Sequence, residues 1–322
     1  MFGDEIPPGF DPFLLRQRMI VMGAADAHGS VWASMLFGAP GFIETVDRHT
    51  LGIAAAPVPG DPLENAFDAA RDIGLLAIEP RTAYRVRING VARRHGGGLR
   101  VRTEQVLGNC PKYLQLREPA ADGPPTAPRP PRTTGGLDAA QRAWIESADT
   151  FFIASRAPEH GADASHRGGE PGFVSVTGPR RLVWPDYSGN SFYMTLGNLH
   201  LSPACGLLFV DWAQGHFLHL SGKAEIVWDE ARRAGVPGAL RMVAFDIDKV
   251  VRIDRASPLR WTYAGPSPYN PPASRGDFRS PRRALDVVRG EFRRGGTGSR
   301  RPAGAGRPRD YFSAASEGTT MP

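Results

Sequence analysis

The sequence predicts a mainly β protein, a small β-barrel with few helices that occurs twice in one chain. Short runs of Val, Ile, Leu and Phe alternate with turn residues at intervals of about 8 to 12 residues, which is typical of barrels and sandwiches. The second observation is an internal repeat, and the third is the scarcity of helical periodicity. With 322 residues, 41% of them hydrophobic, the chain is long enough to bury two cores.

The internal repeat relates the two halves of the chain. Residues 20–24 (IVMGA) correspond to residues 151–155 (FFIAS), and at the same offset residues 40–42 (PGF) match residues 171–173 (PGF) without a gap. Solenoid repeats have periods of about 20 to 50 residues, so a period this long indicates a duplicated domain.

Each half contains five predicted strands and two predicted helices. The strands are expected at residues 19–24, 30–36, 51–55, 74–78 and 84–89, and at residues 151–155, 164–167, 182–184, 206–211 and 217–227. A helix is expected before each first strand, because Leu137, Trp144, Ile145 and Ala148 share one helical face and Phe13 and Leu14 match Trp144 and Ile145. Further helices are predicted at residues 63–71 and, in the second half, at residues 195–201.

Composition divides the chain into four segments. Residues 120–136 (AADGPPTAPRPPRTTGG) hold five prolines and three glycines without a large apolar residue, so they are expected to form an extended linker. The linker separates a first half, residues 1–119, from a second half, residues 137–265. Residues 266–322 are rich in Arg, Gly and Pro and are expected to be a basic, disordered tail.

The charge distribution excludes some classes of partner. The net charge is +6, and from Arg275 onward eleven arginines outweigh five acids, so the whole excess lies in the tail. The body is formally neutral, and nucleic acid is therefore not an expected partner. No apolar run approaches the ~20 residues of a membrane span, so no membrane association is expected. We predict a cytoplasmic protein.

Cysteine and histidine usage argues against disulfide and metal chemistry. Cys110 and Cys205 are too few for a disulfide scaffold, fit a reducing compartment, and are expected to be buried. His216 and His219 would point to opposite faces of one strand, so no metal site is predicted. His166 is the candidate proton donor, with a structural role as the alternative. No nucleotide-binding, hydrolase or zinc-protease motif is present.

A polar, glycine-rich segment at residues 163–173 ends a predicted strand. Alternation places Ser165 and Arg167 on one face, where a hydroxyl and a guanidinium could hold a phosphate together. A surface strand followed by a Gly-Gly turn explains the segment equally well, so the sequence leaves both readings open.

A second polar segment, residues 184–198, follows the third strand of the second half. Its polar and aromatic side chains would suit a bound ring system, and the start of the short helix near Thr195 could hold an anion. A turn between strand and helix is the alternative, but it explains only Gly189 and Asn190.

Taken together, these motifs carry a family resemblance. The runs SHRGGEPGF, DYSGN, TLGN, SPACGLLFVD and LSGKA resemble the pyridoxamine 5′-phosphate oxidase-like family of FMN-binding split barrels. The first half resembles it through VWAS, GAPGF, GDPL, IGLLAI and ING, and GNCPKY resembles an element of the tandem branch. The resemblance covers residues 10–262.

The resemblance implies two tandem FMN-binding split barrels that form an intrachain pseudo-dimer with FMN between them. The family's cofactor contacts then fall on Ser165, Arg167, Asp186, Tyr187, Ser188, Asn190 and Thr195. In the first half, Leu36 stands at the position of Arg167, so one competent site per chain is expected, with ring cover from Trp32 and Lys112. Ser188-Gly189-Asn190 replaces the Ser-Arg-Lys of vitamin B6 oxidases, and vitamin B6 oxidation is therefore not implied.

The expected function is that of an FMN-dependent oxidoreductase acting on a small-molecule substrate. The flavin would perform the redox chemistry, so no acid–base constellation is required. The alternatives are a non-catalytic split-barrel binding module and a relative that binds deazaflavin or haem. The sequence leaves open whether the protein is a monomeric pseudo-dimer or a homodimer.

Overall fold

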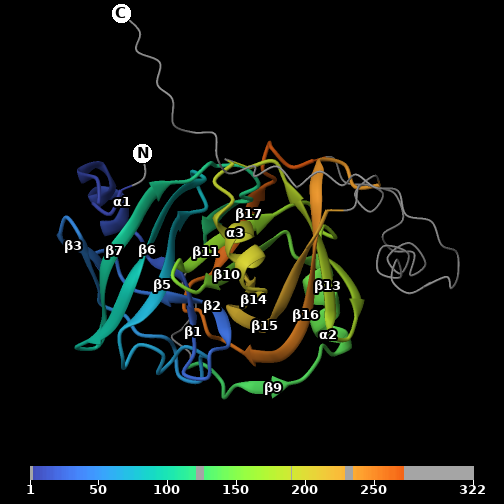
Figure 1. Cartoon of the computed structure of the whole chain (residues 1–322), viewed down its shortest axis with the longest axis horizontal. Coiled ribbons are helices and arrows are strands. Elements are labelled where there is room, and N and C mark those ends of the chain that lie inside the picture. The colour runs from blue at the N-terminus through green and yellow to red at the C-terminus, as the bar shows by residue number, and fades with distance from the viewer. Residues whose placement is uncertain (1–2, 121–126, 190, 229–234, 272–322) are drawn as a thin grey trace, which may run out of the picture.

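The structure, a computed structural model, describes residues 3–120, 127–189, 191–228 and 235–271. Strands dominate these residues, and the predicted mainly β fold class is confirmed. In Figure 1, the blue-to-cyan first half lies on the left and packs beside the green-to-orange second half on the right. None of the described helices could cross a bilayer, since the longest, α2, has nine residues.

The first half forms a seven-stranded antiparallel sheet in the order β2-β1-β5-β6-β7-β4-β3. Its strands are β1 (Met19–Ala25), β2 (Val31–Phe37), β3 (Ile43–Asp47), β4 (Thr50–Ile53), β5 (Arg71–Glu79), β6 (Tyr84–His95) and β7 (Gly98–Gly108). The five predicted strands of this half are present. The sequence reasoning missed β3 and β7.

The second half forms a sheet in the order β11-β10-β14-β15-β16-β13-β12, and β9 pairs with β16 beside it. The strands are β9 (Arg132–Thr134), β10 (Thr150–Ala157), β11 (Gly161–Gly168), β12 (Ser175–Gly178), β13 (Arg181–Tyr187), β14 (Ala204–Asp211), β15 (His216–Val227) and β16 (Ala239–Ile253). Strand β9 lies inside the predicted linker. The sequence reasoning missed β9, β12 and β16.

The two sheets have the same topology. Strands β1 to β7 of the first half correspond, in chain order, to strands β10 to β16 of the second half. With this correspondence, the strand orders of the two sheets are identical. The register also repeats, because Ile20 pairs with Leu36 while Phe151, 131 residues later, pairs with Arg167. The halves share one architecture strand by strand, as the sequence repeat predicts.

The predicted helices before the first strands are present, as α1 (Asp11–Leu15) and α2 (Ala139–Ser147). Asp138 begins α2 with a capping box, in which its side chain accepts from the backbone of Gln141. The helix α3 (Met194–Leu201) confirms the prediction at residues 195–201. A further short helix, η1 (Pro8–Phe10), precedes α1.

The predicted helix at residues 63–71 is wrong, because this segment forms turns that lead into β5. Carbonyl groups that a helix would use internally are taken by side chains: Arg94 donates to the Glu64 carbonyl at 2.7 Å, and Arg71 donates to the Ala66 carbonyl at 2.8 Å. Asp61 caps the first turn by accepting from the Leu63 amide. Side-chain partners therefore replace the helical ladder.

The two halves pack through a shared core. One hydrophobic cluster joins first-half residues such as Ile20 and Leu75 to second-half residues such as Phe152 and Leu208. Strand β5 contacts β11, and the equivalent pair β14 and β2 makes the equivalent contact. The chain ends of the halves also meet, because β8 (Leu116–Pro119) pairs with β17 (Trp261–Gly265). We call the contact region between the halves the seam.

Candidate functional site

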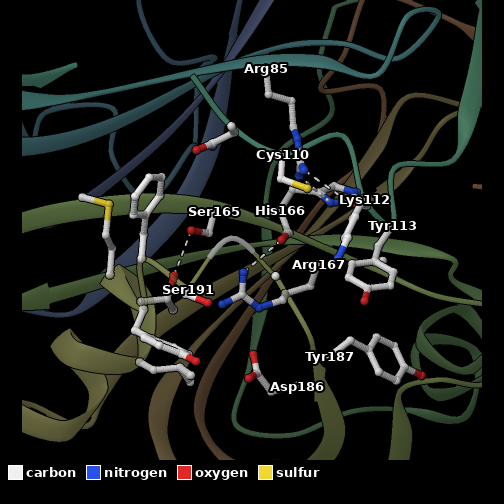
Figure 2. A pocket seen from close by; sticks show the side chains of 18 of the residues that line it. Arg85, Cys110, Lys112, Tyr113, Ser165, His166, Arg167, Asp186, Tyr187 and Ser191 are labelled. Atoms are coloured by element: carbon white, nitrogen blue, oxygen red, sulfur yellow. Dashed lines mark hydrogen bonds between the residues drawn. The ribbon is translucent and has the colours of Figure 1, made fainter. Parts of the chain in front are cut away.

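An open pocket lies at the seam and takes its walls from both halves. The first half contributes β6 and the segment 109–113 after β7. The second half contributes β11, the end of β13 and the start of α3 (Figure 2). The pocket holds about 860 Å³ of empty space, part of which is continuous with solvent.

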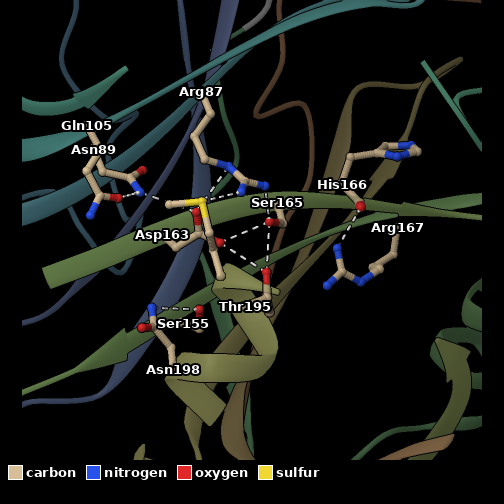
Figure 3. A network of polar contacts seen from close by, with 11 residues as sticks. Arg87, Asn89, Gln105, Ser155, Asp163, Ser165, His166, Arg167, Thr195 and Asn198 are labelled. Carbon is tan, nitrogen blue, oxygen red and sulfur yellow. Dashed lines mark hydrogen bonds and ion pairs between the residues drawn. The ribbon is translucent and has the colours of Figure 1, made fainter. Parts of the chain in front are cut away.

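A buried polar network fixes the floor of the pocket (Figure 3). The carboxylate of Asp163 accepts from the hydroxyls of Ser165 at 2.9 Å and Thr195 at 3.0 Å. Arg87 crosses the seam from β6 and forms an ion pair with the same carboxylate, its Nε lying 3.1 Å from Oδ1. Arg87 also donates to Ser165. The network therefore neutralises Arg87 and holds Ser165 and Thr195 in place.

Arg167 and Asp186 form the second-half wall. The Arg167 side chain is half-buried, and its Nη1 donates to the His166 carbonyl at 3.0 Å. Burial lowers the pKa of Arg167, although the charge of Asp186 opposes this shift. Asp186 itself pairs with Arg241 at 3.3 Å, and burial raises the pKa of the Asp186 carboxyl. Among the described residues, no carboxylate lies within ion-pair distance of Arg167.

Arg85 is a buried guanidinium without an acidic partner in the described part of the chain. It is 7% exposed, and its Nε has no hydrogen-bond partner. Its other nitrogens contact His166 Nδ1 at 3.2 Å and the Lys112 carbonyl at 3.3 Å. Burial, followed by repulsion from Arg87, lowers the pKa of Arg85 to about 10. Such a site leaves a positive charge available to an anion.

His166 is held neutral beside this arginine. Burial, reinforced by the charges of Arg85 and Arg167, lowers the pKa of His166 well below its usual value of 6.5. A guanidinium can only donate, so Nδ1 accepts from Arg85 and the ring proton resides on Nε2. Nε2 is buried and has no hydrogen-bond partner among the described residues. The imidazole of this pocket-lining residue therefore has an unused donor.

Two tyrosines stand at the edge of the pocket. The rings of Tyr113 and Tyr187 lie 5.3 Å apart, and the Tyr113 hydroxyl donates to the Ser188 carbonyl at 2.8 Å. Burial raises the pKa of Tyr187 to about 12, so this phenol stays protonated. The pair bridges the two halves and offers an aromatic edge.

The structure brings most of the predicted site residues together. The residues that line the pocket are Ser165, Arg167, Asp186, Tyr187, Thr195 and Lys112. Ser188 takes part through its carbonyl, and Asn190 lies outside the described residues. Trp32 lies apart from them: it is 1% exposed, its indole donates to Asp26, and it lines another pocket.

The sequence reasoning missed Arg85, Arg87 and Tyr113, and it placed Cys110 in the core. Cys110 is instead partly exposed and lines the pocket, whereas Cys205 is buried as expected. Arg85 and Arg87 stand two apart in the apolar run of β6, so they share a strand face that is otherwise buried. Two charged residues on a strand face that is otherwise buried could have indicated these site residues from the sequence.

The equivalent position at the other end of the seam is closed. Ser34 stands where Ser165 stands in the repeat, and it donates to Asp61, whose carboxylate lies 3.9 Å from His219. Burial raises the pKa of Asp61 and lowers that of His219. Leu36, at the position of Arg167, is fully buried. In the described part of the chain, the repeat position of Arg167 therefore holds an apolar side chain in place of a guanidinium.

Comparison with known proteins gives a family for the second half. Residues 137–255 match the family model described as pyridoxamine 5′-phosphate oxidase. No curated protein matches the chain.

Solved structures with similar folds each resemble about a third of the chain. HupZ from Group A Streptococcus has 10% identity over 41% of this chain and 98% of its own, with a TM-score of 0.28. A FAD-binding protein from Mesorhizobium loti has 14% identity over 38% and 97%, with a TM-score of 0.27. A protein of the pyridoxinephosphate oxidase family from Clostridium acetobutylicum has 12% identity over 37% and 89%, with a TM-score of 0.25. Over residues 137–255, the second half is therefore similar to the pyridoxamine 5′-phosphate oxidase family.

Proposed function

We propose that this protein binds one flavin, FMN, in the seam pocket and acts as an oxidoreductase on a small molecule in the cytoplasm. The match of residues 137–255 to the family model supports a flavin cofactor. The observation that carries the proposal is a pair of arginines, Arg85 and Arg167, in a pocket made by both halves; among the described residues neither has a carboxylate within ion-pair distance.

The charges of the pocket suit the phosphate of FMN. Asp163 is already paired with Arg87, and Asp186 is paired with Arg241. A phosphate monoester carries about −1.5 to −2 charges near pH 7, and arginine forks bind its oxygens in pairs. Arg167 would therefore anchor the phosphate, and Arg85 and Lys112 would add charge from the first half.

The remaining walls suit an aromatic ring. Tyr113 and Tyr187 offer an aromatic edge, and Phe173 adds an apolar surface. When bound, the flavin supplies hydride or electron transfer. The chain would orient the flavin, exclude water, and offer the His166 Nε2 proton as a hydrogen-bond donor to the ligand.

Arg167→Ala tests the anchor. Loss of a hydrogen bond to a charged group costs roughly 1.5–3 kcal/mol, so FMN should bind about 10- to 100-fold more weakly, as measured by fluorescence quenching titration. Arg93→Ala is the matched control, because Arg93 is exposed on β6 and lines a different pocket. Equal FMN affinity in wild type and Arg167→Ala would remove the anchor assignment.

A visible spectrum of the purified chain separates the alternatives. Flavin, deazaflavin and haem have distinct bands, and a non-catalytic module without a cofactor has none. A chain that is colourless and does not bind added FMN would contradict the proposal.

A further inference from the structure

Cys110 is a thiol in an unusual place for this chain. It follows β7 and lines the seam pocket, where it is partly exposed. Cys205, the other cysteine of the chain, is 0% exposed in the core of the second half. Burial raises the pKa of Cys205 far above its usual value, so this thiol is inert. Any thiol chemistry of the native chain therefore falls on Cys110.

The surroundings of Cys110 are cationic. Figure 2 shows its sulfur beside the guanidinium of Arg85, and a negative charge on Cys110 interacts favourably with that arginine. Arg85 is more than nine-tenths buried, it is aimed into the pocket, and its Nε has no partner. Lys112 and Arg167 line the same pocket. Cations of this kind attract anionic reagents to the pocket.

We propose that Cys110 is a thiolation site that reacts with anionic low-molecular-weight disulfides. Its proton leaves to solvent, and the thiolate attacks one sulfur of the disulfide. The old S–S bond breaks as the new one forms, and the other half departs as a thiolate. Cys110 is thereby oxidised and the departing sulfur is reduced. Arg85 and Lys112 hold the anionic groups of the reagent.

The product is a mixed disulfide, since the chain offers no second thiol to resolve it. The sequence has two cysteines, and Cys205 is sealed in the core. The adduct would occupy the pocket to which we assign FMN, so thiolation and flavin binding should compete. This last consequence rests on the proposed function, whereas the reactivity of Cys110 does not.

The test compares two disulfide reagents on the full chain, freed of bound ligands and without added flavin. Dithiobis(nitrobenzoate) is anionic, and dithiodipyridine is uncharged. We expect one thiol per native chain to react and Cys110→Ser to abolish that reaction. We define the rate ratio as the rate with the anionic reagent divided by the rate with the uncharged reagent. This ratio should be on the order of tenfold higher for Cys110 than for free glutathione.

Charge variants identify the source of the selectivity. Lys112→Gln and Arg85→Gln should each lower the rate ratio several-fold, and salt should lower it in the wild type. Lys112 is half-buried and forms no side-chain ion pair with any described residue, so its variant keeps the test valid if Arg85→Gln does not fold. Arg93→Gln is the matched control and should keep the wild-type ratio. An unreactive native chain, or a ratio equal to that of glutathione in every variant, would overturn the proposal.

Added FMN separates the two proposals. If FMN binds, it should slow the reaction of Cys110 in proportion to occupancy, and unchanged rates at saturation would overturn the competition. If FMN does not bind, the proposed function is wrong. The thiolation proposal is then still tested by the reactivity of Cys110 measured without flavin.

Discussion

At the scale of single residues, two arginines on one strand face have opposite roles. Arg87 forms an ion pair with Asp163 and thereby links β6 to β11 across the seam. Arg85, two residues earlier, meets His166 and a backbone carbonyl but no carboxylate among the described residues. A buried ion pair is structural, whereas a buried cation without a counter-charge is costly unless a ligand supplies one. We therefore propose that Arg85 serves to bind an anionic ligand.

His166 should make stability depend on pH. Its pKa lies well below 6.5 in the folded chain, so the unfolded chain binds the proton first as pH falls. Stability should therefore drop below about pH 6.5, by up to about 1.4 kcal/mol per pH unit for this residue. His166→Gln should show a correspondingly shallower slope in urea unfolding between pH 7 and pH 5. Identical slopes in wild type and variant would contradict the buried, neutral imidazole.

Strand alternation predicted that Ser165 and Arg167 share one face of their strand, but left open whether that face holds a ligand. The two residues lie two apart on β11, and both line the pocket. Arg85 was not predictable in the same way, because its role depends on the contact with His166, 81 residues later. Trp32 was expected to cover the flavin ring, but its hydrogen bond to Asp26 holds it elsewhere.

At the scale of elements, two glycines set how closely the halves approach. A Cβ on Gly74 of β5 would lie 2.4 Å from the Ala164 nitrogen of β11. A Cβ on Gly206 of β14 would lie 2.5 Å from the Cα of Trp32 on β2. These positions are equivalent in the two sheets, and both obstacles are backbone atoms that cannot move aside. The strand-to-strand contact thus requires glycine on both sides of the seam.

Gly206→Ala should destabilise the whole chain. Overpacking of this kind costs about 1–3 kcal/mol in the free energy of unfolding, measured by urea denaturation. Gly97→Ala is the matched control, because a Cβ there meets nothing within 4 Å and should change stability by no more than about 0.5 kcal/mol. If the Gly206→Ala chain were as stable as the control, strands β14 and β2 would have to lie further apart than in this structure.

Some secondary-structure elements could be predicted from the sequence, and others could not. In β7, Leu99 and Val101 are buried while Arg100 and Arg102 are exposed, an alternation that predicts a strand with one solvated face. The turns at residues 62–69 could not be predicted, because Arg94 binds the Glu64 carbonyl from β6, 30 residues later in the chain. Local periodicity does not register such a distant partner.

At the scale of the whole molecule, the repeated topology gives two equivalent positions at the seam, and these positions differ in the residues that line them. One position is open and cationic, with Arg167 and Arg85 facing it. At the other, Leu36 replaces Arg167, and Ser34, Asp61 and His219 fill the buried space. We therefore propose that the chain holds a single flavin site, although its two sheets share one topology.

Equilibrium titration of the full chain with FMN, read by absorbance after removal of free ligand, tests this directly. One FMN per chain is the predicted ratio, whatever the oligomeric state. A ratio of two would contradict the closure of the second position, and a ratio of zero would contradict the flavin site itself.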